Sequence, residues 1–180
     1  MAILLGELGG ERSIFSLEKV LSHKDPRVAR AAVRSLSKIA SATAYRVLAR
    51  AMDRGSEDLK INIIQTCAVA GNEAILPQLL DIIRSKAQLG GADSLRRRAI
   101  EAVGRIGSRQ AVPPLAEILE KRSLFTMAED VDTRLSAVRA IGAIGGAEAE
   151  EALERAARKD PKEDVRLEAE RALDQLQHNE

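Results

Sequence analysis

The sequence of 180 residues predicts an all-α fold built from a repeated pair of short helices. The clearest copy of this pair is LRRRAIEAVGRIGSRQAVPPLAEIL, which runs from Leu95 to Leu119. Apolar residues recur every three or four positions in its first half, as on one face of a helix: Leu95, Ala99, Val103 and Ile106. A second apolar face follows: Val112, Leu115, Ile118 and Leu119. Gly107 lies between the two halves, where glycine commonly ends a helix.

The same pattern recurs along the whole chain in a constant register. With Leu95 as position zero, the equivalent residues are Val28, Leu59, Thr133 and Val165, at spacings of 31, 36, 38 and 32 residues. Position 4 is alanine or isoleucine in the five copies whose position zero lies within the chain: Ala32, Ile63, Ala99, Ala137 and Ala169. Position 20, in the second helix, is always leucine: Leu17, Leu48, Leu79, Leu115 and Leu153. Spacings of this size are typical of helical-repeat proteins, in which each unit buries its apolar face against its neighbours.

Two further positions hold small residues. Position 9 is Gly6, Ser37, Ala68, Gly104 and Gly142, and position 12 is Gly9, Ala40, Gly71, Gly107 and Gly145. We expect position 9 to let the paired helices approach closely and position 12 to form the turn that caps the first helix. The last copy has Asp174 and Gln177 at these positions, which indicates a terminal helix with one side in solvent.

The elements follow in order along a single domain, 1–180. We expect helix pairs over residues 1–24, 25–55, 56–91, 92–129 and 130–159, and then a capping helix over 160–177. Asp25 and Asp160 each precede a proline, as an N-cap acceptor precedes proline at the first helical position. Prolines also fall near the start of second helices: Pro77, Pro113 and Pro114. Because Met1 enters halfway through a first helix, we expect that the chain was cut from a longer protein; the alternative is that this apolar edge packs on another surface.

The composition argues against several classes of protein. A net charge of +1 gives no strong attraction to nucleic acid or to a membrane, and no apolar stretch approaches the ~20 residues of a membrane span. The short apolar run at the N-terminus lacks the basic leader of a signal peptide. A single cysteine excludes an intramolecular disulfide and fits a reducing compartment. We therefore expect a cytoplasmic protein.

The chain offers little for catalysis. His23 and His178 fall in a linker and in the tail, and Cys67 takes a core position at which other copies have leucine, valine or isoleucine. No phosphate-binding loop, dinucleotide fingerprint or Cys/His cluster of metal-ligand spacing is present in the sequence. We expect a protein that is not an enzyme and that needs no cofactor and no metal.

First helices of the form VRxxAxxxLxxI, Gly-rich turns and second helices of the form AVPPL resemble HEAT-like repeats, in the short bacterial form of the phycobilisome lyase subunits. The resemblance covers essentially the whole chain. It implies a right-handed α-α superhelix of about five helix pairs with a C-terminal capping helix, in which second helices line the concave side. The arginine common at position 1 in this family is present as Arg96, Arg134 and Arg166 but is replaced by Ala29 and Lys60, so any polar ladder between repeats is incomplete. The commonest role of the family is protein–protein scaffolding, and its members include bilin lyases and DNA glycosylases.

On this basis we expect the concave face to bind a peptide or helix of a protein partner. Its residues at positions 18, 21 and 22 run from a basic end through an apolar middle to an acidic end: Lys19, Arg46, Arg50, Pro77, Leu80, Pro113, Ala116, Glu151 and Glu154. Such a gradient suits a partner of opposite polarity, with the apolar middle giving affinity. The alternative is that this is ordinary repeat surface and that Leu80 packs on its neighbour.

Three other hypotheses remain open. The long connection after residue 120 offers Phe125 and Met127 as a loop anchor, unless this loop folds back over the fourth and fifth units. A nucleic-acid-binding domain would use the basic region Arg96, Arg97, Arg98, Arg105 and Arg109, although nearby glutamates dilute its charge and stacking aromatics are missing. A lyase-like or chaperone subunit is implied by the family resemblance alone.

Overall fold

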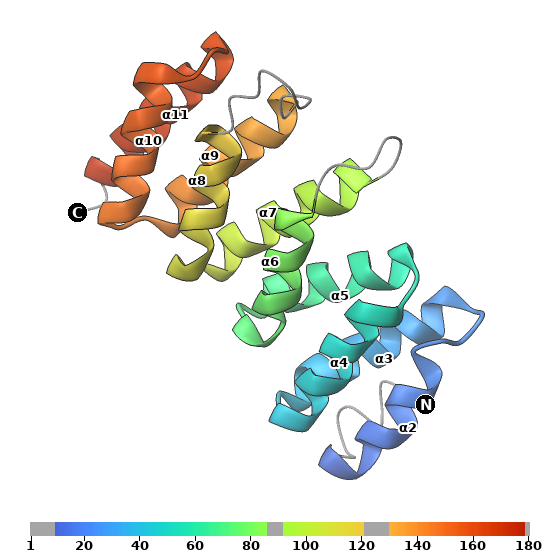
Figure 1. The fold of residues 1–180 in the computed structure, drawn as a ribbon. Helices are drawn as coiled ribbons and strands as arrows, with labels where there is room; N and C mark the ends of the chain where they lie inside the picture. Colours follow the sequence, from blue (N-terminus) through green and yellow to red (C-terminus); the bar gives the residue numbers. More distant parts are fainter. Residues whose placement is uncertain (1–9, 86–91, 121–129, 179–180) are drawn as a thin grey trace. The chain divides into compact units, whose positions relative to one another are not determined.

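The computed structural model describes residues 10–85, 92–120 and 130–178, and within these ranges every regular element is a helix (Figure 1). The chain divides into two compact units, Met1–Leu79 and Leu80–Glu180, which are considered separately below. The all-α fold predicted from the sequence is confirmed. Within the described residues, no helix is long and apolar enough to cross a membrane.

Unit 1 contains the first helix pairs. Its elements are η1 (Gly10–Ser13), α2 (Ile14–Val20), α3 (Pro26–Ile39), α4 (Ala42–Arg54), α5 (Glu57–Val69), η2 (Glu73–Ile75) and the start of α6 (Leu76–Arg84). Helix α3 packs against α2, α4 and α5, so a first helix contacts both second helices beside it and the next first helix. The core side chains Leu17, Leu36, Leu48 and Ile63 are fully buried in this packing.

Unit 2 repeats the arrangement. After the end of α6 it contains α7 (Ala92–Ile106), η3 (Arg109–Ala111), α8 (Val112–Glu120), α9 (Val131–Ile144), α10 (Ala147–Lys159) and α11 (Glu163–His178). Helix α9 packs against α7, α8, α10 and α11. Helix α11 packs against both α9 and α10.

The positions that the sequence repeat predicts to be apolar are the positions buried in the core. Every residue at position 4 and every leucine at position 20 has a solvent-exposed fraction of 0%. The residues at position 12 confirm the expected capping turn, because Ala40, Gly71, Gly107 and Gly145 have φ of 52°, 61°, 77° and 67°. This left-handed conformation costs little for glycine but is strained for Ala40.

The small residues at position 9 act between repeats and not within a pair. A Cβ on Gly104 of α7 would lie 2.9 Å from Cα of Ala140 on α9. A Cβ on Gly142 of α9 would lie 3.0 Å from Cβ of Ala172 on α11. The expectation that these residues bring the two helices of one pair together is therefore wrong. The close approach joins the first helices of successive repeats.

One of the two expected Asp-Pro helix starts is confirmed. Asp25 accepts a hydrogen bond from the backbone N–H of Arg27 at 2.9 Å, and Pro26 is the first residue of α3. Asp160 also accepts from a backbone N–H two residues on, but α11 begins only at Glu163. The carboxylate of Asp160 is instead buried in an ion pair, which is described below.

Candidate partner-binding surfaces

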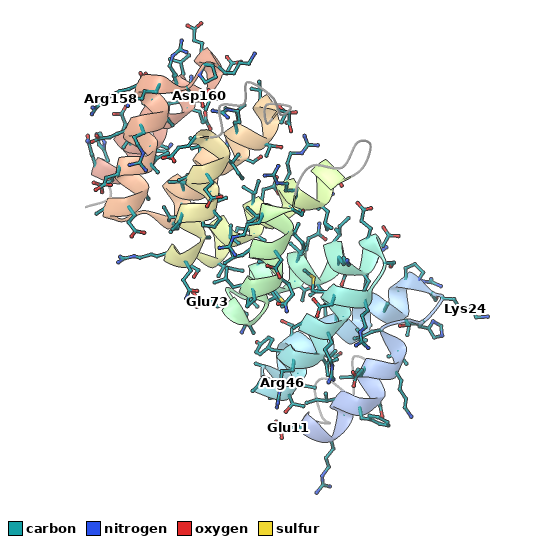
Figure 2. The ribbon with its side chains drawn as sticks, viewed as in Figure 1. Glu11, Lys24, Arg46, Glu73, Arg158 and Asp160 are labelled. Carbon is teal, nitrogen blue, oxygen red and sulfur yellow. The ribbon has the colours of Figure 1, made fainter. Side chains whose placement is uncertain are left out.

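The second helices of unit 1 present an exposed basic surface, hereafter the α2–α4 surface: Phe15, Glu18, Lys19, Arg46 and Arg50. A guanidinium nitrogen of Arg50 lies 2.9 Å from a carboxylate oxygen of Glu18, which joins the two helices. The ammonium of Lys19 lies 4.3 Å from the centre of the Phe15 ring. Arg46, labelled in Figure 2, is exposed and donates to Ala42 O and Thr43 Oγ1 of its own helix. The exposed side chains combine an aromatic ring with an excess of positive charge.

Phe15 is the largest exposed apolar side chain on this surface, with 66% of its area in solvent. It occupies position 18, like Arg46, Pro77 and Pro113, all of which are also exposed. An exposed phenylalanine leaves apolar area in water, and the lysine above it offers only a modest cation–π contact in return. Aromatic and arginine side chains placed together are the usual high-energy contacts of protein interfaces.

The second helices of unit 2 present an acidic surface, hereafter the α8–α10 surface: Glu117, Glu120, Glu151, Glu154 and Arg155. The guanidinium of Arg155 bridges the two helices, with Nε 3.0 Å from Glu120 and a terminal nitrogen 3.7 Å from Glu151. Glu154 pairs with Arg158, labelled in Figure 2, at 2.8 Å. All three ion pairs are solvated, so they hold the side chains only loosely.

The apolar middle predicted for the concave face needs correction. Leu80 is only 9% exposed, so it belongs to the core and cannot serve as a docking contact. This burial agrees with the alternative given for it, that Leu80 packs on its neighbours. Pro77 and Pro113 are exposed and Ala116 is half-buried, so these three still offer surface within their own units.

The position-1 arginines make a repeated structural contact. Arg96 Nε donates to the carbonyl of Ile83 at 2.9 Å, near the end of α6. Arg134 donates to the carbonyls of Ile118 and Leu119 at 3.0 and 2.8 Å, at the end of α8. Arg166 donates to the carbonyl of Asp160 at 2.8 Å, just after α10. Each arginine thus satisfies carbonyls that a helix end leaves without partners, at the negative end of its dipole. We call these contacts the arginine clamps.

The clamp of Arg134 includes a buried ion pair. Its guanidinium also contacts the carboxylate of Asp160, and the two side chains are 4% and 0% exposed. Asp160 is labelled in Figure 2 at the end of α10. The second oxygen of its carboxylate accepts from the N–H of Lys162 at 2.9 Å. The pair therefore ties α9 to the ends of α8 and α10.

The nucleic-acid hypothesis is wrong for Arg96, because a side chain buried to 3% exposure and bonded to a carbonyl cannot meet a phosphate. Arg97 is half-buried and lies 3.8 and 3.5 Å from the carboxylates of Asp130 and Asp132. Arg109 lies against Gly146, its Nε 3.5 Å from where a Cβ would stand. Arg98 is half-buried and Arg105 is exposed. The basic region does not form a row of free cations.

A family model that matches most of the chain shows which family the chain belongs to. The family model described as HEAT repeats matches residues 1–59 and 90–174. The chain belongs to the HEAT-repeat family. The α-α superhelical fold class predicted from the sequence is confirmed with it. No curated protein matches the sequence.

One solved structure shares the fold of this chain. A chain in the structure of the complex of CpcE and CpcF of phycocyanin lyase from Nostoc sp. PCC7120 aligns with a TM-score of 0.62 at 20% identity, over 92% of this HEAT chain. The HEAT chain spans 65% of the length of that chain. Human deoxyhypusine hydroxylase in complex with glycerol aligns with a TM-score of 0.33 at 21% identity, over 98% of this chain and 78% of its own, too weakly to carry an argument. At 20% identity the likeness to the phycocyanin lyase chain concerns the fold alone.

The residues considered for catalysis are buried or bonded to the backbone in this HEAT chain: Cys67, His23 and His178. Burial raises the pKa of the Cys67 thiol to about 11, which keeps the thiol protonated and poorly nucleophilic. His23 Nδ1 accepts from the N–H of Asp25 at 3.0 Å, and His178 Nδ1 lies 2.6 Å from the carbonyl of Asp174. Among the described residues, no group of three or more His, Cys, Asp or Glu side chains is placed to hold a metal ion.

Some features were missed from the sequence, and some expected residues lie elsewhere. Phe15 had the signal of an exposed position, since it shares position 18 with Arg46 and two prolines, but it was not chosen as an anchor. Arginine recurring at position 1 indicates a shared role, but the carbonyls that it meets are backbone groups that no side-chain pattern reveals. Phe125 and Met127, the expected loop anchor, lie outside the described residues, so this hypothesis stays a prediction.

Proposed function

We propose that this HEAT chain is a non-catalytic protein-binding module whose second helices hold a peptide or a helix of a partner protein. Two findings support a protein partner in general terms. The chain belongs to a family of repeat scaffolds, and the phycocyanin lyase structure with the same fold is a complex of two proteins. The surface that contacts the partner is inferred from the side chains themselves.

The α2–α4 surface carries the proposal, through Phe15. Among the described residues, Phe15, Val69 and Leu167 are the large apolar side chains that are exposed. Of these three, Phe15 is the one that lies on a second helix. The ammonium of Lys19 lies over its ring, and Arg50 of α4 pairs with Glu18 on the helix of Phe15. A partner that covers Phe15 removes its ring from water and strengthens the interaction of the ring with Lys19.

The charges indicate what each surface prefers. Lys19, Arg46 and Arg50 outnumber Glu18 on the α2–α4 surface, so it favours a partner segment with acidic residues beside an apolar side chain. Glutamates outnumber arginine on the α8–α10 surface, which therefore favours a basic segment. Complementary charge of this kind sets orientation and association rate more than affinity.

The experiment is capture of binding proteins from the source cell on the full chain. Phe15→Ala and Arg50→Glu should each reduce capture of the same protein, and together they should abolish it. Leu167→Ala removes an exposed apolar side chain from α11, and Arg27→Glu reverses an exposed charge on α3, so both are matched controls that should capture normally. Circular dichroism checks that every variant folds.

Two results would reject the proposal. If the Phe15 and Arg50 variants capture the same proteins as the wild type, the α2–α4 surface is not the contact. If the captured material disappears after nuclease treatment, the chain binds nucleic acid instead.

A further inference from the structure

Unit 1 contains a hollow of about 790 Å³ on the side of its first helices. The walls are the connection between α2 and α3, the start of α3, the turn between α4 and α5, and the first turns of α5. The lining residues that matter here are Leu21, Ala29, Arg30, Arg54, Leu59 and Asn62. The volume lies within the range of roughly 300–1,000 Å³ typical of ligand pockets. None of the residues of the α2–α4 surface lines it.

The hollow lies at a repeat junction that lacks an arginine clamp. Ala29 occupies position 1, where Arg96, Arg134 and Arg166 extend to the end of the preceding second helix. Leu21 is the counterpart of Ile83 and Leu119, whose carbonyls receive those arginines. Both Ala29 and Leu21 line the hollow. An alanine at position 1 therefore leaves open the space next to α2 that an arginine side chain fills in unit 2.

The lining combines exposed cationic side chains with half-buried apolar ones. Lys24, Arg30 and Arg54 are exposed, and none of them forms an ion pair with a carboxylate of the described residues, while Asp58 is the one acidic residue in the lining. Figure 2 labels Lys24 on the connection between α2 and α3, extending outward from it. The half-buried side chains of Ala29, Leu59 and Ile61 supply apolar area.

Asn62 adds a polar group with unused capacity. Its side-chain oxygen is buried and accepts no hydrogen bond from the described residues. A buried acceptor without a donor is unfavourable, so a ligand that supplies a donor gains from this oxygen. Asn62 is also one of the residues that line the hollow.

We infer that this hollow binds a short acidic segment of a partner protein, in addition to the contact proposed for the second helices. Carboxylates of the segment meet Arg30, Arg54 and Lys24, an apolar side chain rests on Leu59 and Ile61, and a backbone N–H reaches Asn62. A peptide carries all three kinds of group. An isolated phosphate has no apolar part, and a nucleic-acid strand brings bases for which the lining offers no Phe, Tyr or Trp ring.

The test measures the binding of fluorescein-labelled peptides to the full chain by anisotropy. The probes are an array of short peptides that each carry one leucine among glutamates at varied spacing, with polyglutamate and neutral peptides alongside. We expect the best leucine-containing peptide to bind more tightly than polyglutamate and to weaken as salt is added. Arg30→Gln/Arg54→Gln should weaken it about fivefold or more, whereas Arg27→Gln, which changes an exposed arginine of α3 outside the hollow, should leave it within about twofold.

Ala29→Arg separates shape from charge. This variant adds a positive charge but should fill the hollow with a fourth clamp, so we expect at least about fivefold weaker binding together with unchanged or raised thermal stability. Tighter binding by Ala29→Arg would overturn the inference, because diffuse charge would then explain the affinity. Equal affinity of Arg30→Gln/Arg54→Gln and the wild type, or peptides no better than the neutral ones, would also overturn it.

Two further arms complete the test. Displacement of the peptide by millimolar inorganic phosphate would overturn the inference in favour of a site for an isolated anion. The Phe15→Ala/Arg50→Glu variant should bind the peptide normally, because neither residue lines the hollow. Loss of peptide binding in this variant would assign the peptide to the α2–α4 surface and would overturn the inference while supporting the proposed function.

Discussion

The two units of this HEAT chain use their arginines differently. In unit 2 the position-1 arginines Arg96, Arg134 and Arg166 donate to carbonyls at the ends of second helices, and Arg134 is buried against Asp160. In unit 1 the same position is Ala29 or Lys60, and exposed arginines lie around a hollow or on the α2–α4 surface. Position 1 therefore holds repeats together through arginine in unit 2, whereas unit 1 has no arginine at this position.

The difference teaches that a charged residue in a repeat cannot be assigned to binding or to packing by its type. Its role follows from what the neighbouring repeat places opposite it. A helix end that offers free carbonyls draws an arginine into the interior. An alanine at the same position leaves a hollow whose rim keeps its own cations in solvent. The predictions below change one side of this comparison at a time.

The largest effect is expected from the buried pair of unit 2. Arg134→Met should lower the free energy of unfolding by about 3–5 kcal/mol, because it leaves the carboxylate of Asp160 buried without its partner. Arg139→Met is the control. Arg139 lies on the exposed side of α9, the helix that also carries Arg134, and pairs with Glu168 of α11. This substitution should cost less than about 1 kcal/mol. Urea unfolding measures both. Equal losses in the two variants would contradict the role given to the clamp.

The next largest effect is a pH-dependent loss of stability caused by the buried thiol of Cys67 in unit 1. Burial raises the pKa of Cys67 from 9.0 to about 11, so between these values the folded chain keeps a proton that the unfolded chain has lost. Stability is therefore complete below about pH 9 and should fall by about 2–3 kcal/mol as the pH rises to 11. Cys67→Val, with the valine that Val103 supplies in unit 2, should lack this part of the decline. Identical pH profiles in urea unfolding would count against the burial of the thiol.

The register of the core was readable from the sequence, and the fate of individual polar residues was not. Positions 4 and 20 are buried in both units because each repeat turns the same face to the next one. The burial of Arg96 could not be inferred in the same way, because it depends on the carbonyl of Ile83, a backbone group that no side-chain pattern reveals. Leu80 was misassigned for a related reason. Its position is polar or alanine in the other repeats, yet here it is a core residue beside Leu79.

The start of the last helix shows the same limit. Asp160-Pro161 has the local pattern of a helix start, but the carboxylate is held by Arg134, 26 residues earlier, and α11 begins later. The hollow was equally hidden, since it arises from Ala29 in one repeat and Leu21 in the repeat before it. A local motif predicts local structure. The start of α11 and the hollow depend on contacts between repeats, which a local motif does not show.

The smallest effect concerns the capping turn of unit 1. Ala40 has a φ of 52°, where Gly71, Gly107 and Gly145 hold the same position in the other repeats. Ala40→Gly should raise the free energy of unfolding by about 0.5–1 kcal/mol, because relief of left-handed strain exceeds the greater freedom of glycine in the unfolded chain. Gly107→Ala should destabilise the chain in the matching turn of unit 2. Thermal unfolding of the two variants checks the pair, and a loss of stability in Ala40→Gly would refute the assignment of strain.

The central claim, that the second helices of unit 1 bind a protein, is tested most directly by hydrogen–deuterium exchange of the full chain with and without the captured partner. The account predicts that the partner slows exchange in α2 and α4, and that Phe15→Ala/Arg50→Glu abolishes this protection. Protection confined to the first helices of unit 2, or no protection by a partner that demonstrably binds, would contradict it.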